Sequence, residues 1–543
     1  MSVFKSASMC KFRIIIPKDY YYRVKFALIN LKTLHLDAWW DDEEFVDFIK
    51  EHYIEGEESG KEIDIKSLSK LHNESDKFKR VLENTQNLIR MLGLEAESLR
   101  TISKEIKIDE DYLTKLEDKL SLLDSKIKEA SKLIEGEEKF SLKDKLYEIF
   151  PNYESILSEA KYVFEMILDQ DDKVFHGDFL TYMFGWVPED RVNEVIETLN
   201  RVTGNSVVIS ISHPGKHDHP PFLSKSPKAL KPFESLIKTY DIPSPHELNP
   251  TIIVSITFPM LFGLAFADIG HGLLLAIFGV FSCMLKRKGF SGGEMVNLVL
   301  SGAELYLLCG IAAIFGGLMF GEIFGFHIHH PPLEFILKAI PGIGRAFSPL
   351  KEPMKMFKLS LMVGMIHISL GLILSMINDI LEGEYKKAIF GSACWLWFYL
   401  GLMYLGLFVY KLNMDKWISG YLTIPLVVLP VVLMLIGMIL TEGPIDGFAH
   451  TFEAAISSLS HTVSYGRILA LSLSHGMLSQ LLSSVIPALG AAGYIILAIG
   501  TITLIMALEG LVSFTHVLRL TWVEFGFKYF RGGGEEYKPL GIK

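Results

Sequence analysis

The chain has 543 residues, of which half are apolar, 12% are aromatic and 21% are charged. With 53 basic and 63 acidic side chains its formal net charge is -10, which gives no support to nucleic-acid binding. The sequence contains no Walker loop, GxGxxG fingerprint or nucleophile elbow, so nothing indicates that this chain cleaves nucleotides by itself or holds a cofactor. The four cysteines form no CxxC pattern and predict neither a disulfide framework nor a metal site: Cys10, Cys283, Cys309 and Cys394.

Charged and apolar residues are segregated along the chain. Residues 1–248 are rich in charge and begin with no apolar signal segment, so we expect a soluble arm on the cytoplasmic side. Near its start a strand over 12–16 precedes a helix over 20–33, and a second unit of strand, helix and strand follows near its end. We therefore expect two small α/β lobes, at about 1–60 and 175–225.

The segment between these lobes, about 63–170, is predicted to be helical. Apolar residues at alternating spacings of three and four indicate about three heptads of a coiled coil: Leu113, Leu116, Leu120, Leu123, Ile127, Ala130 and Ile134. A looser series predicts its antiparallel partner, so that the arm contains a coiled-coil hairpin: Phe78, Val81, Leu88, Leu92 and Leu99. The alternative is two amphipathic helices packed on another surface.

Residues 249–543 contain successive apolar blocks that are long enough to span a membrane. The blocks lie at about 251–285, 296–325, 356–380, 389–411, 418–440, 448–486 and 490–530. Asp268, Gly270 and Gly272 lie in the middle of the first block, where a charge in hydrocarbon costs about 3 kcal/mol, so we predict a helix bend there. The bend gives about eight spans, returns the basic residues 286–288 to the cytoplasmic side and leaves both termini there.

The last two blocks exceed the ~20 residues that an upright span needs, so we expect long, tilted helices. In the first of them a polar residue recurs every seven positions and forms one stripe, with His475 beside it: Glu453, Ser460, Arg467 and Ser474. In the second, polar residues share one broad face: Glu509, Ser513, His516 and Arg519. Each helix therefore brings an acid, a histidine and an arginine to membrane depth.

Charged groups at membrane depth usually mark ion pathways or their counter-ions, and a buried structural pair is the alternative. An arginine keeps its proton and suits a fixed counter-charge, whereas glutamates and histidines can pass protons or line a wet path. The histidine-rich segment 324–332 contains His327, His329 and His330, which we interpret as part of a surface loop and not as a metal site.

Six segments, in this order, resemble the membrane stator subunit of the archaeal and vacuolar-type rotary ATPases, called subunit I in prokaryotes and subunit a in eukaryotes. They are "FGWVP" at 184–188, "PFESLIKTYDIPSPHELNPT" at 232–251, "FPMLFGLAFADIGHG" at 258–272, "LMFGEIFG" at 318–325, "SHTVSYGRILALSLSHG" at 460–476 and "LEGLVSFTHVLRLTWVEF" at 508–525. The resemblance implies a subunit that does not hydrolyse ATP and that presents two offset half-channels to a rotating ring of carboxylate-bearing subunits. It implies that Arg467 and Arg519 face that carboxylate and that four residues line the channels: Glu453, His475, Glu509 and His516.

The same resemblance implies the partners and the location. The partners are a proteolipid ring of c/K subunits, peripheral-stalk subunits of the E/G type held by the N-terminal arm, an adaptor between central stalk and ring, the lipid bilayer, and translocated H⁺ or Na⁺. The location is a prokaryotic cell membrane or a vacuolar-type endomembrane. Two rival functions remain: a secondary cation antiporter, which should contain internal repeats that these spans lack, and a membrane-anchored coiled-coil scaffold, which leaves the polar stripes unexplained.

Overall fold

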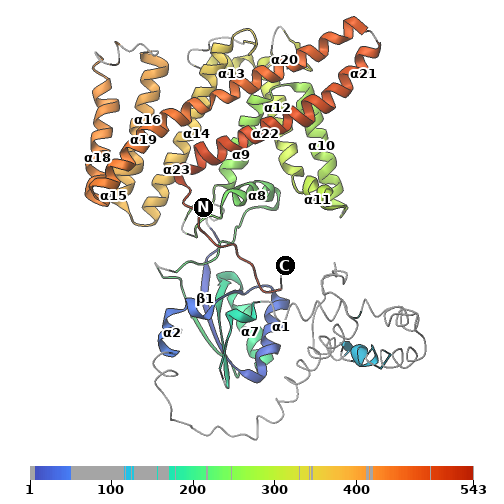
Figure 1. Ribbon diagram of the computed structural model, residues 1–543, viewed down its shortest axis with the longest axis vertical. Helices are drawn as coiled ribbons and strands as arrows, with labels where there is room; N and C mark the ends of the chain where they lie inside the picture. The colour runs from blue at the N-terminus through green and yellow to red at the C-terminus, as the bar shows by residue number, and fades with distance from the viewer. Residues whose placement is uncertain are drawn as a thin grey trace, which may run out of the picture. The chain divides into compact units, whose positions relative to one another are not determined.

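The computed structural model describes residues 6–49, 115–126 except 117 and 124, residue 156, and 170–541 apart from short gaps. The gaps are 178, 216–217, 246, 291, 329–330, 341–342, 344–346, 411–414, 416, 418–419 and 490. The chain forms two compact units (Figure 1). The sheet unit comprises Ala7–Leu223 and Glu536–Lys543, and the helical unit comprises Met1–Ser6 and Ser224–Glu535.

A single antiparallel sheet organises the sheet unit. Its strands follow the order β2 (His35–Asp37), β4 (Leu180–Pro188), β1 (Met9–Pro17) and β5 (Val208–Ser212), and β3 (Phe175–His176) also pairs with β4. The long pair β1–β4 runs in register from Met9 opposite Pro188 to Pro17 opposite Leu180. The prediction of two separate lobes at about 1–60 and 175–225 is therefore wrong, because β1 alone would leave two unpaired edges and β4 and β5 cover them.

Alternation along β1 explains the core of the sheet unit. Phe12, Ile14 and Ile16 are fully buried, as expected for one face of a strand, and they share a hydrophobic cluster with two helices. These helices are α1 (Tyr21–Leu31) and α7 (Val192–Thr203). The predicted strand at 12–16 and helix at 20–33 thus correspond to β1 and α1. The remaining short elements are η1 (Lys18–Tyr20), η2 (Trp39–Asp41), α2 (Glu43–Ile49), η5 (Asp171–Lys173) and η6 (Glu189–Arg191).

Asp171 of η5 contacts both α1 and β3 through its carboxylate. Its carboxylate accepts hydrogen bonds from Tyr21 and from the buried Lys25, whose Nζ lies 2.8 Å away, and His176 lies 3.6 Å from its other oxygen. Burial alone would raise the pKa of Asp171, but the hydrogen bonds from His176, Lys25 and Tyr21 outweigh it and hold this pKa well below its usual value. The ionised carboxylate therefore stabilises the sheet unit.

Most of the predicted coiled-coil hairpin, about 63–170, lies outside the described residues. The described part of 115–126 is helical, and Leu116, Leu120 and Leu123 are buried in the same cluster as Ile14. The three leucines are therefore the packed face of their helix. The pairing of two helices in a coiled coil stays a prediction.

The helical unit contains six helices that are long and apolar enough to cross a membrane, counting only the described residues. They are Ile269–Arg287, Ala303–Phe320, Pro353–Leu381, Tyr385–Val409, Ile424–Glu442 and Gly493–Tyr529. In element labels these are α10 (Ile269–Arg287), α12 (Ala303–Phe320), α14 (Pro353–Leu381), α15 with η8, α16 and η9 (Tyr385–Lys387, Ala388–Ala393, Cys394–Tyr404, Leu405–Val409), η10 with α18 (Ile424–Val428, Leu429–Glu442), and the C-terminal run. Shorter helices are η7 (Lys228–Leu230), α8 (Lys231–Tyr240), α9 (Thr251–Ala265), α11 (Glu294–Ser301) and α13 (Glu334–Ala339). The count of about eight spans stays a prediction.

The first apolar block is divided at Asp268. α9 ends at Ala265, and Asp268 is the N-cap of α10, where its side chain accepts a hydrogen bond from the His271 backbone N–H. Gly270 and Gly272 do not form the bend, because both lie inside α10. A Cβ at Gly270 would collide with the Phe324 ring and one at Gly272 with the backbone of α12, so these glycines permit close packing.

The last two apolar blocks form a long antiparallel pair that runs obliquely across the other helices in Figure 1. The first is interrupted at Tyr465, which separates α19 (Pro444–Ser464) from α20 (Gly466–Leu489). The second consists of α21 (Ala491–Gly500), η11 (Thr501–Glu509), α22 (Gly510–Arg519), η12 (Leu520–Gly526) and α23 (Phe527–Tyr529). Both η11 and η12 are π-helical, a distortion that is frequent at functional sites.

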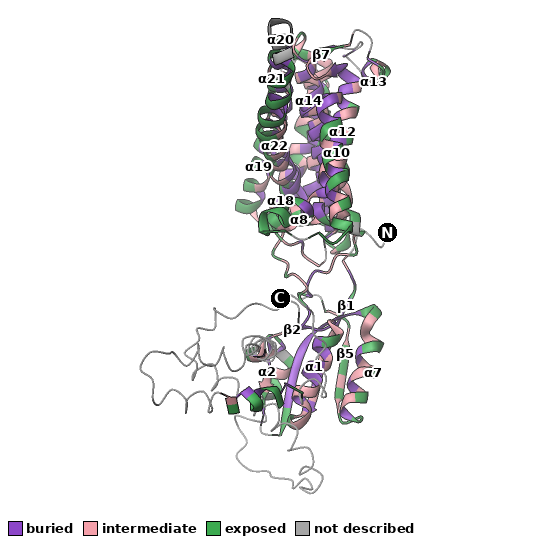
Figure 2. Cartoon of the chain, turned by 90° about the vertical axis from the view of Figure 1, so that its right-hand side faces the viewer, coloured by how far each residue is buried: buried purple, intermediate pink, exposed green. Residues whose placement is uncertain are grey.

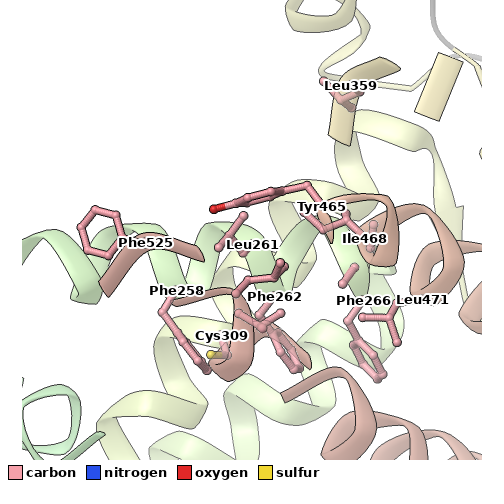
Figure 3. Packing of buried hydrophobic residues seen from close by; sticks show 14 of the residues in the cluster. Phe258, Leu261, Phe262, Phe266, Cys309, Leu359, Tyr465, Ile468, Leu471 and Phe525 are labelled. Carbon is pink, nitrogen blue, oxygen red and sulfur yellow. The ribbon is translucent and has the colours of Figure 1, made fainter. Parts of the chain in front are cut away.

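Aromatic packing holds the interruption at Tyr465 in place. The fully buried Tyr465 lies 2.8 Å from His367 of α14 through its hydroxyl, and His367 stacks on Phe525 at a centroid distance of 4.4 Å. Figure 3 shows Tyr465, Ile468 and Leu471 gathered with the phenylalanines of the α9 segment. Gly466 allows α14 to approach, because a Cβ there would lie 3.3 Å from Phe357. This core fixes the part of the chain that carries Arg467.

Candidate functional site

Three contacts fix the register of the two C-terminal helical runs. His475 Nδ1 lies 3.1 Å from Glu509 Oε2, Arg467 Nη1 donates to Glu524 Oε1 at 3.3 Å, and Lys528 Nζ donates to Ser457 Oγ at 2.9 Å. At about 1.5 Å per residue, Arg467 is about 21 Å along the helices from Glu453 and about 12 Å from His475. Arg467 therefore lies between two groups of ionisable side chains.

The first group is the histidine cluster, which we define as Asp268, His271, Glu322, His475 and Glu509. All five side chains are buried, with exposed fractions between 0% and 8%. The rings of His271 and His475 lie 5.2 Å apart in an edge-to-face arrangement. Glu322 is close enough to interact electrostatically with both Asp268 and His475. The structure thus brings three predicted site residues, Asp268, His475 and Glu509, together with His271 and Glu322.

Asp268 ties this cluster to a small hairpin of β6 (Glu322–Ile323) and β7 (Phe326–His327). The two residues of its turn, Phe324 and Gly325, both have positive φ, as a tight type I′ hairpin requires. Their backbone N–H groups donate to the Asp268 carboxylate at 3.0 and 3.1 Å. The carboxylate therefore caps α10 and holds the hairpin that supplies Glu322.

Arg467 is partly exposed, and among the described residues it has one carboxylate partner. Its side chain is 27% exposed, whereas that of Glu524 is 3% exposed. Glu524 also accepts a hydrogen bond from Ser464, and both donors use the same oxygen. Because Nη1 is the only guanidinium nitrogen that the described residues engage, the rest of the group remains able to bind a second carboxylate.

Arg519 and His516 lie on α22 and differ in exposure. Arg519 is exposed and His516 is half-buried, and the described residues supply neither a hydrogen bond nor an ion pair to either of them. Glu509 and Ser513, which share their predicted face, are buried instead. One side of the predicted face is therefore buried and carries Glu509, and the other side is exposed and carries Arg519.

The second group surrounds a cavity of about 190 Å³, which we name the lysine cavity. Charged and titratable residues line much of it: Asp379, Lys387, His450, Glu453, Lys528 and Arg531. Lys528 is 5% exposed, and its Nζ lies 4.2 Å from the centroid of the Trp395 ring. Asp379 accepts hydrogen bonds from Arg531 at 2.7 Å and from Ser392 at 2.7 Å. The predicted channel residue Glu453 thus borders a polar space that also contains lysine and arginine side chains.

The outer side of α19 combines apolar and polar residues. Large apolar side chains at helical spacing are more than half exposed: Phe448, Phe452, Ile456, Leu459 and Val463. The predicted stripe runs beside them, with Glu453, Ser460 and Ser474 exposed and Arg467 partly so. Figure 2 shows exposed residues along α19–α22 and buried ones on the inner helices. Such a face suits an apolar partner that carries a polar group.

Sequence reasoning did not identify several members of these groups as site residues, among them His271, Glu322, Asp379 and Lys528, and it also missed Glu524, the partner of Arg467. Each is an ionisable side chain within or at the end of an apolar block, and that position is itself the signal that could have identified them. The histidine-rich segment proposed as a surface loop is only partly described, since His329 and His330 lie outside the described residues.

Comparison with known proteins gives a consistent set of relatives. The chain matches the V-type ATPase 116kDa subunit family over residues 66–335 and 442–542. It is 26% identical over 431 residues to the A-type ATP synthase subunit I of Pyrococcus horikoshii, covering 74% of this chain and 62% of that protein. It is 25% identical over 452 residues to the subunit I of Methanocaldococcus jannaschii, covering 77% and 63% respectively.

A eukaryotic relative is the V-type proton ATPase 116 kDa subunit a 1 of Mus musculus, 25% identical over 501 residues, which cover 66% of this chain and 60% of that protein. The chain thus spans less than two thirds of the length of these three relatives. The relatives are subunits of larger complexes, and the family is not catalytic on its own. With its six apolar helices the chain is an integral membrane protein, and it belongs to the V-type ATPase 116 kDa subunit family.

Proposed function

We propose that this chain is the non-rotating membrane subunit of a V/A-type rotary ATPase or ATP synthase. In this role it couples translocation of H⁺ or Na⁺ to ATP hydrolysis or synthesis carried out by other subunits. The observation that carries the proposal is the position of Arg467 on a partly exposed stripe between two groups of ionisable residues. The names of its relatives, A-type ATP synthase subunit I and V-type proton ATPase subunit a, support the same role.

The exposed face of α19 and α22 receives a ring of lipid-embedded subunits, each with one carboxylate. Arg467 and Arg519 hold that carboxylate ionised as it passes, because a carboxylate in a low-dielectric site requires a nearby positive charge. Glu524 holds one side of the Arg467 guanidinium and leaves the other side for the ring. Since arginine does not release its proton, it also blocks direct passage of protons between the two groups.

The two groups of ionisable residues serve as the two half-channels. The histidine cluster supplies one, with His475 and Glu509 exchanging protons with the ring carboxylate and Asp268, His271 and Glu322 extending the path. The lysine cavity supplies the other, with Glu453 at its border. His516 lies on α22 between Glu509 and Arg519 and lines the first path.

The sheet unit and the helical segment 115–126 form part of the stator arm. The arm binds peripheral-stalk subunits of the E/G type and resists the torque of the ring, while the central stalk connects the ring to the nucleotide-binding subunits. The complex lies in a prokaryotic cell membrane or a vacuolar-type endomembrane, with about eight spans and both termini in the cytoplasm. The coiled-coil hairpin at about 63–170 would provide the length of this arm.

Extraction in mild detergent followed by native mass measurement tests the proposal. The expected result is copurification with nucleotide-binding subunits and a proteolipid ring, and ATP-driven ion pumping after reconstitution of that complex. The rival function is a secondary cation antiporter, for which the buried acids and histidines would form the substrate site. A free monomer or dimer that transports ions when reconstituted alone would establish the antiporter and exclude the stator.

A further inference from the structure

The histidine cluster carries an excess of buried acids. Asp268, Glu322 and Glu509 are 0%, 8% and 6% exposed. Within the described part of the chain no lysine or arginine forms an ion pair with any of them. Asp268 accepts three backbone N–H hydrogen bonds, whereas the described residues give Glu322 and Glu509 none from the backbone, and buried carboxylates without such donors favour a bound proton or another cation.

Three side chains of the cluster have the chemistry and spacing of metal ligands. One ligand atom from each of Asp268, His271 and His475 lies within 4.8 Å of the other two. The closest contact, His271 Nδ1 to Asp268 Oδ1, measures 3.2 Å. Ligands at the usual zinc distances are about 3.3 Å apart in a tetrahedral site, so one pair is already at the right separation and small inward movements complete the set.

The hydrogen bonds around His475 favour the same interpretation. Its Nδ1 contacts the Glu509 carboxylate at 3.1 Å, while its Nε2 is buried without a hydrogen-bond partner among the described residues. A carboxylate on one ring nitrogen and a free second nitrogen is the arrangement by which proteins orient a metal-binding histidine. Aromatic rings enclose the group, with Phe266 at 4.2 Å from the His475 ring and Phe324 at 5.1 Å from the His271 ring.

We propose that Asp268, His271 and His475 bind a divalent transition-metal cation of the zinc class, with Glu509 orienting His475. Two imidazoles and one carboxylate are ligands that suit zinc better than calcium or magnesium, and water completes the tetrahedron. Binding requires both histidines to be neutral at the coordinating nitrogen and therefore displaces any proton held there. The second part of the proposal rests on the proposed function: the bound cation also blocks one half-channel and inhibits pumping.

Zinc titration of the intact, chelator-treated complex tests the site. We expect one Zn²⁺ per chain, an X-ray absorption spectrum with two imidazole ligands, and loss of this binding in His271→Gln and His475→Gln. Glu509→Gln keeps all three ligands and should weaken binding by about 10- to 100-fold, so it tests the site even if a histidine variant fails to assemble. His450→Gln and a His329→Gln/His330→Gln double variant are matched controls and should bind zinc as the unmodified chain does.

The outcomes separate this proposal from the stator function. Arg467→Ala should lose pumping and still bind zinc, since Arg467 contacts none of the three ligands in the described structure. Zinc binding that persists unchanged in His271→Gln and His475→Gln, or that disappears only in the His329/His330 variant, would overturn the site. Zinc bound at the cluster with an unchanged pumping rate would overturn the inhibition.

Discussion

The two groups of ionisable residues on either side of Arg467 differ in how they balance charge. The histidine cluster pairs acids with histidines and is enclosed by aromatic rings. The lysine cavity balances Asp379 and Glu453 with Lys528 and Arg531 around about 190 Å³ of space. Histidines change charge near neutral pH whereas arginine does not, so the cluster can exchange protons at its two histidines, while Arg531 gives the cavity one cation that keeps its charge.

This difference indicates a division of roles. A path through the histidine cluster needs side chains that gain and lose protons, because the described residues there are closely packed. A path along the lysine cavity can use water, which fits a polar space of that volume. Arg467 separates the two regions, and Glu524 fixes its position.

Replacing the arginine between the two regions should have the largest effect. Arg467→Ala and Arg467→Lys should both abolish ATP-driven pumping, because alanine removes the charge and a buried lysine can release its proton. The measurement is pumping by reconstituted complexes, with native mass as a check of assembly. Arg467→Ala alone leaves the buried Glu524 carboxylate without its partner. The double variant Arg467→Ala/Glu524→Gln removes that charge as well, and it should also fail to pump. Pumping near the normal rate by an assembled Arg467→Ala complex would make Arg467 part of a structural pair.

Changes in the histidine cluster should slow pumping without stopping it. His475→Gln and Glu509→Gln should each lower the rate by about tenfold, which corresponds to about 1.4 kcal/mol. Because the two side chains are in contact, the double variant should be little slower than either single one. Initial pumping rates at several pH values provide the test. If the rate decrease of the double variant equals the product of the two single decreases, the two residues act independently.

Changes in the lysine cavity should be milder. Lys528→Met removes a buried charge that interacts with Glu453, and we expect about a threefold lower pumping rate, in line with a screened interaction of about 0.6 kcal/mol. Lys528→Arg should retain most of the rate. Lys386→Met is the control, because Lys386 is exposed and does not line the cavity. A Lys528→Met complex as slow as the His475→Gln one would remove the distinction between the two regions.

The sheet unit provides a prediction that involves no transport residue. The pKa of Asp171 is lower in the folded chain than its unfolded value of about 3.9, so its stabilising effect is present above about pH 4 and is lost as the pH falls below that. Asp171→Asn should destabilise this unit by about 1–3 kcal/mol at neutral pH and reduce its acid sensitivity. Hydrogen exchange of the β1 amides in the intact complex measures this effect. Asp172→Asn, at an exposed position, should behave as the unmodified chain, and equal protection in both variants would contradict the role of Asp171.

Local patterns in the sequence predicted the strand at β1, the helix at α1 and the division of the first apolar block at Asp268. They did not predict that β1 pairs with β4, because strands about 170 positions apart leave no local signal of their partner. The polar stripe on α19 and α20 was identified by its period, whereas the contact of Arg467 with Glu524 depends on the antiparallel register of two helices. Glu509 and Arg519 lie ten residues apart at the two ends of the regular helix α22, which places them about 80° apart around its axis, so which of them faces inward depends on how that helix packs and not on spacing alone.

The central claim is that the exposed stripe of α19 faces the proteolipid ring, and site-directed crosslinking tests it most directly. In a chain whose four cysteines are replaced by serine, a photo-crosslinker would be attached at Ser460→Cys, which lies on the exposed stripe. Val432→Cys on α18 is the matched control, because Val432 is 44% exposed on another apolar helix. We predict a crosslink to the proteolipid subunit from position 460 and none from position 432. Equal crosslinking from both positions, or none from position 460 in an assembled complex, would contradict the account.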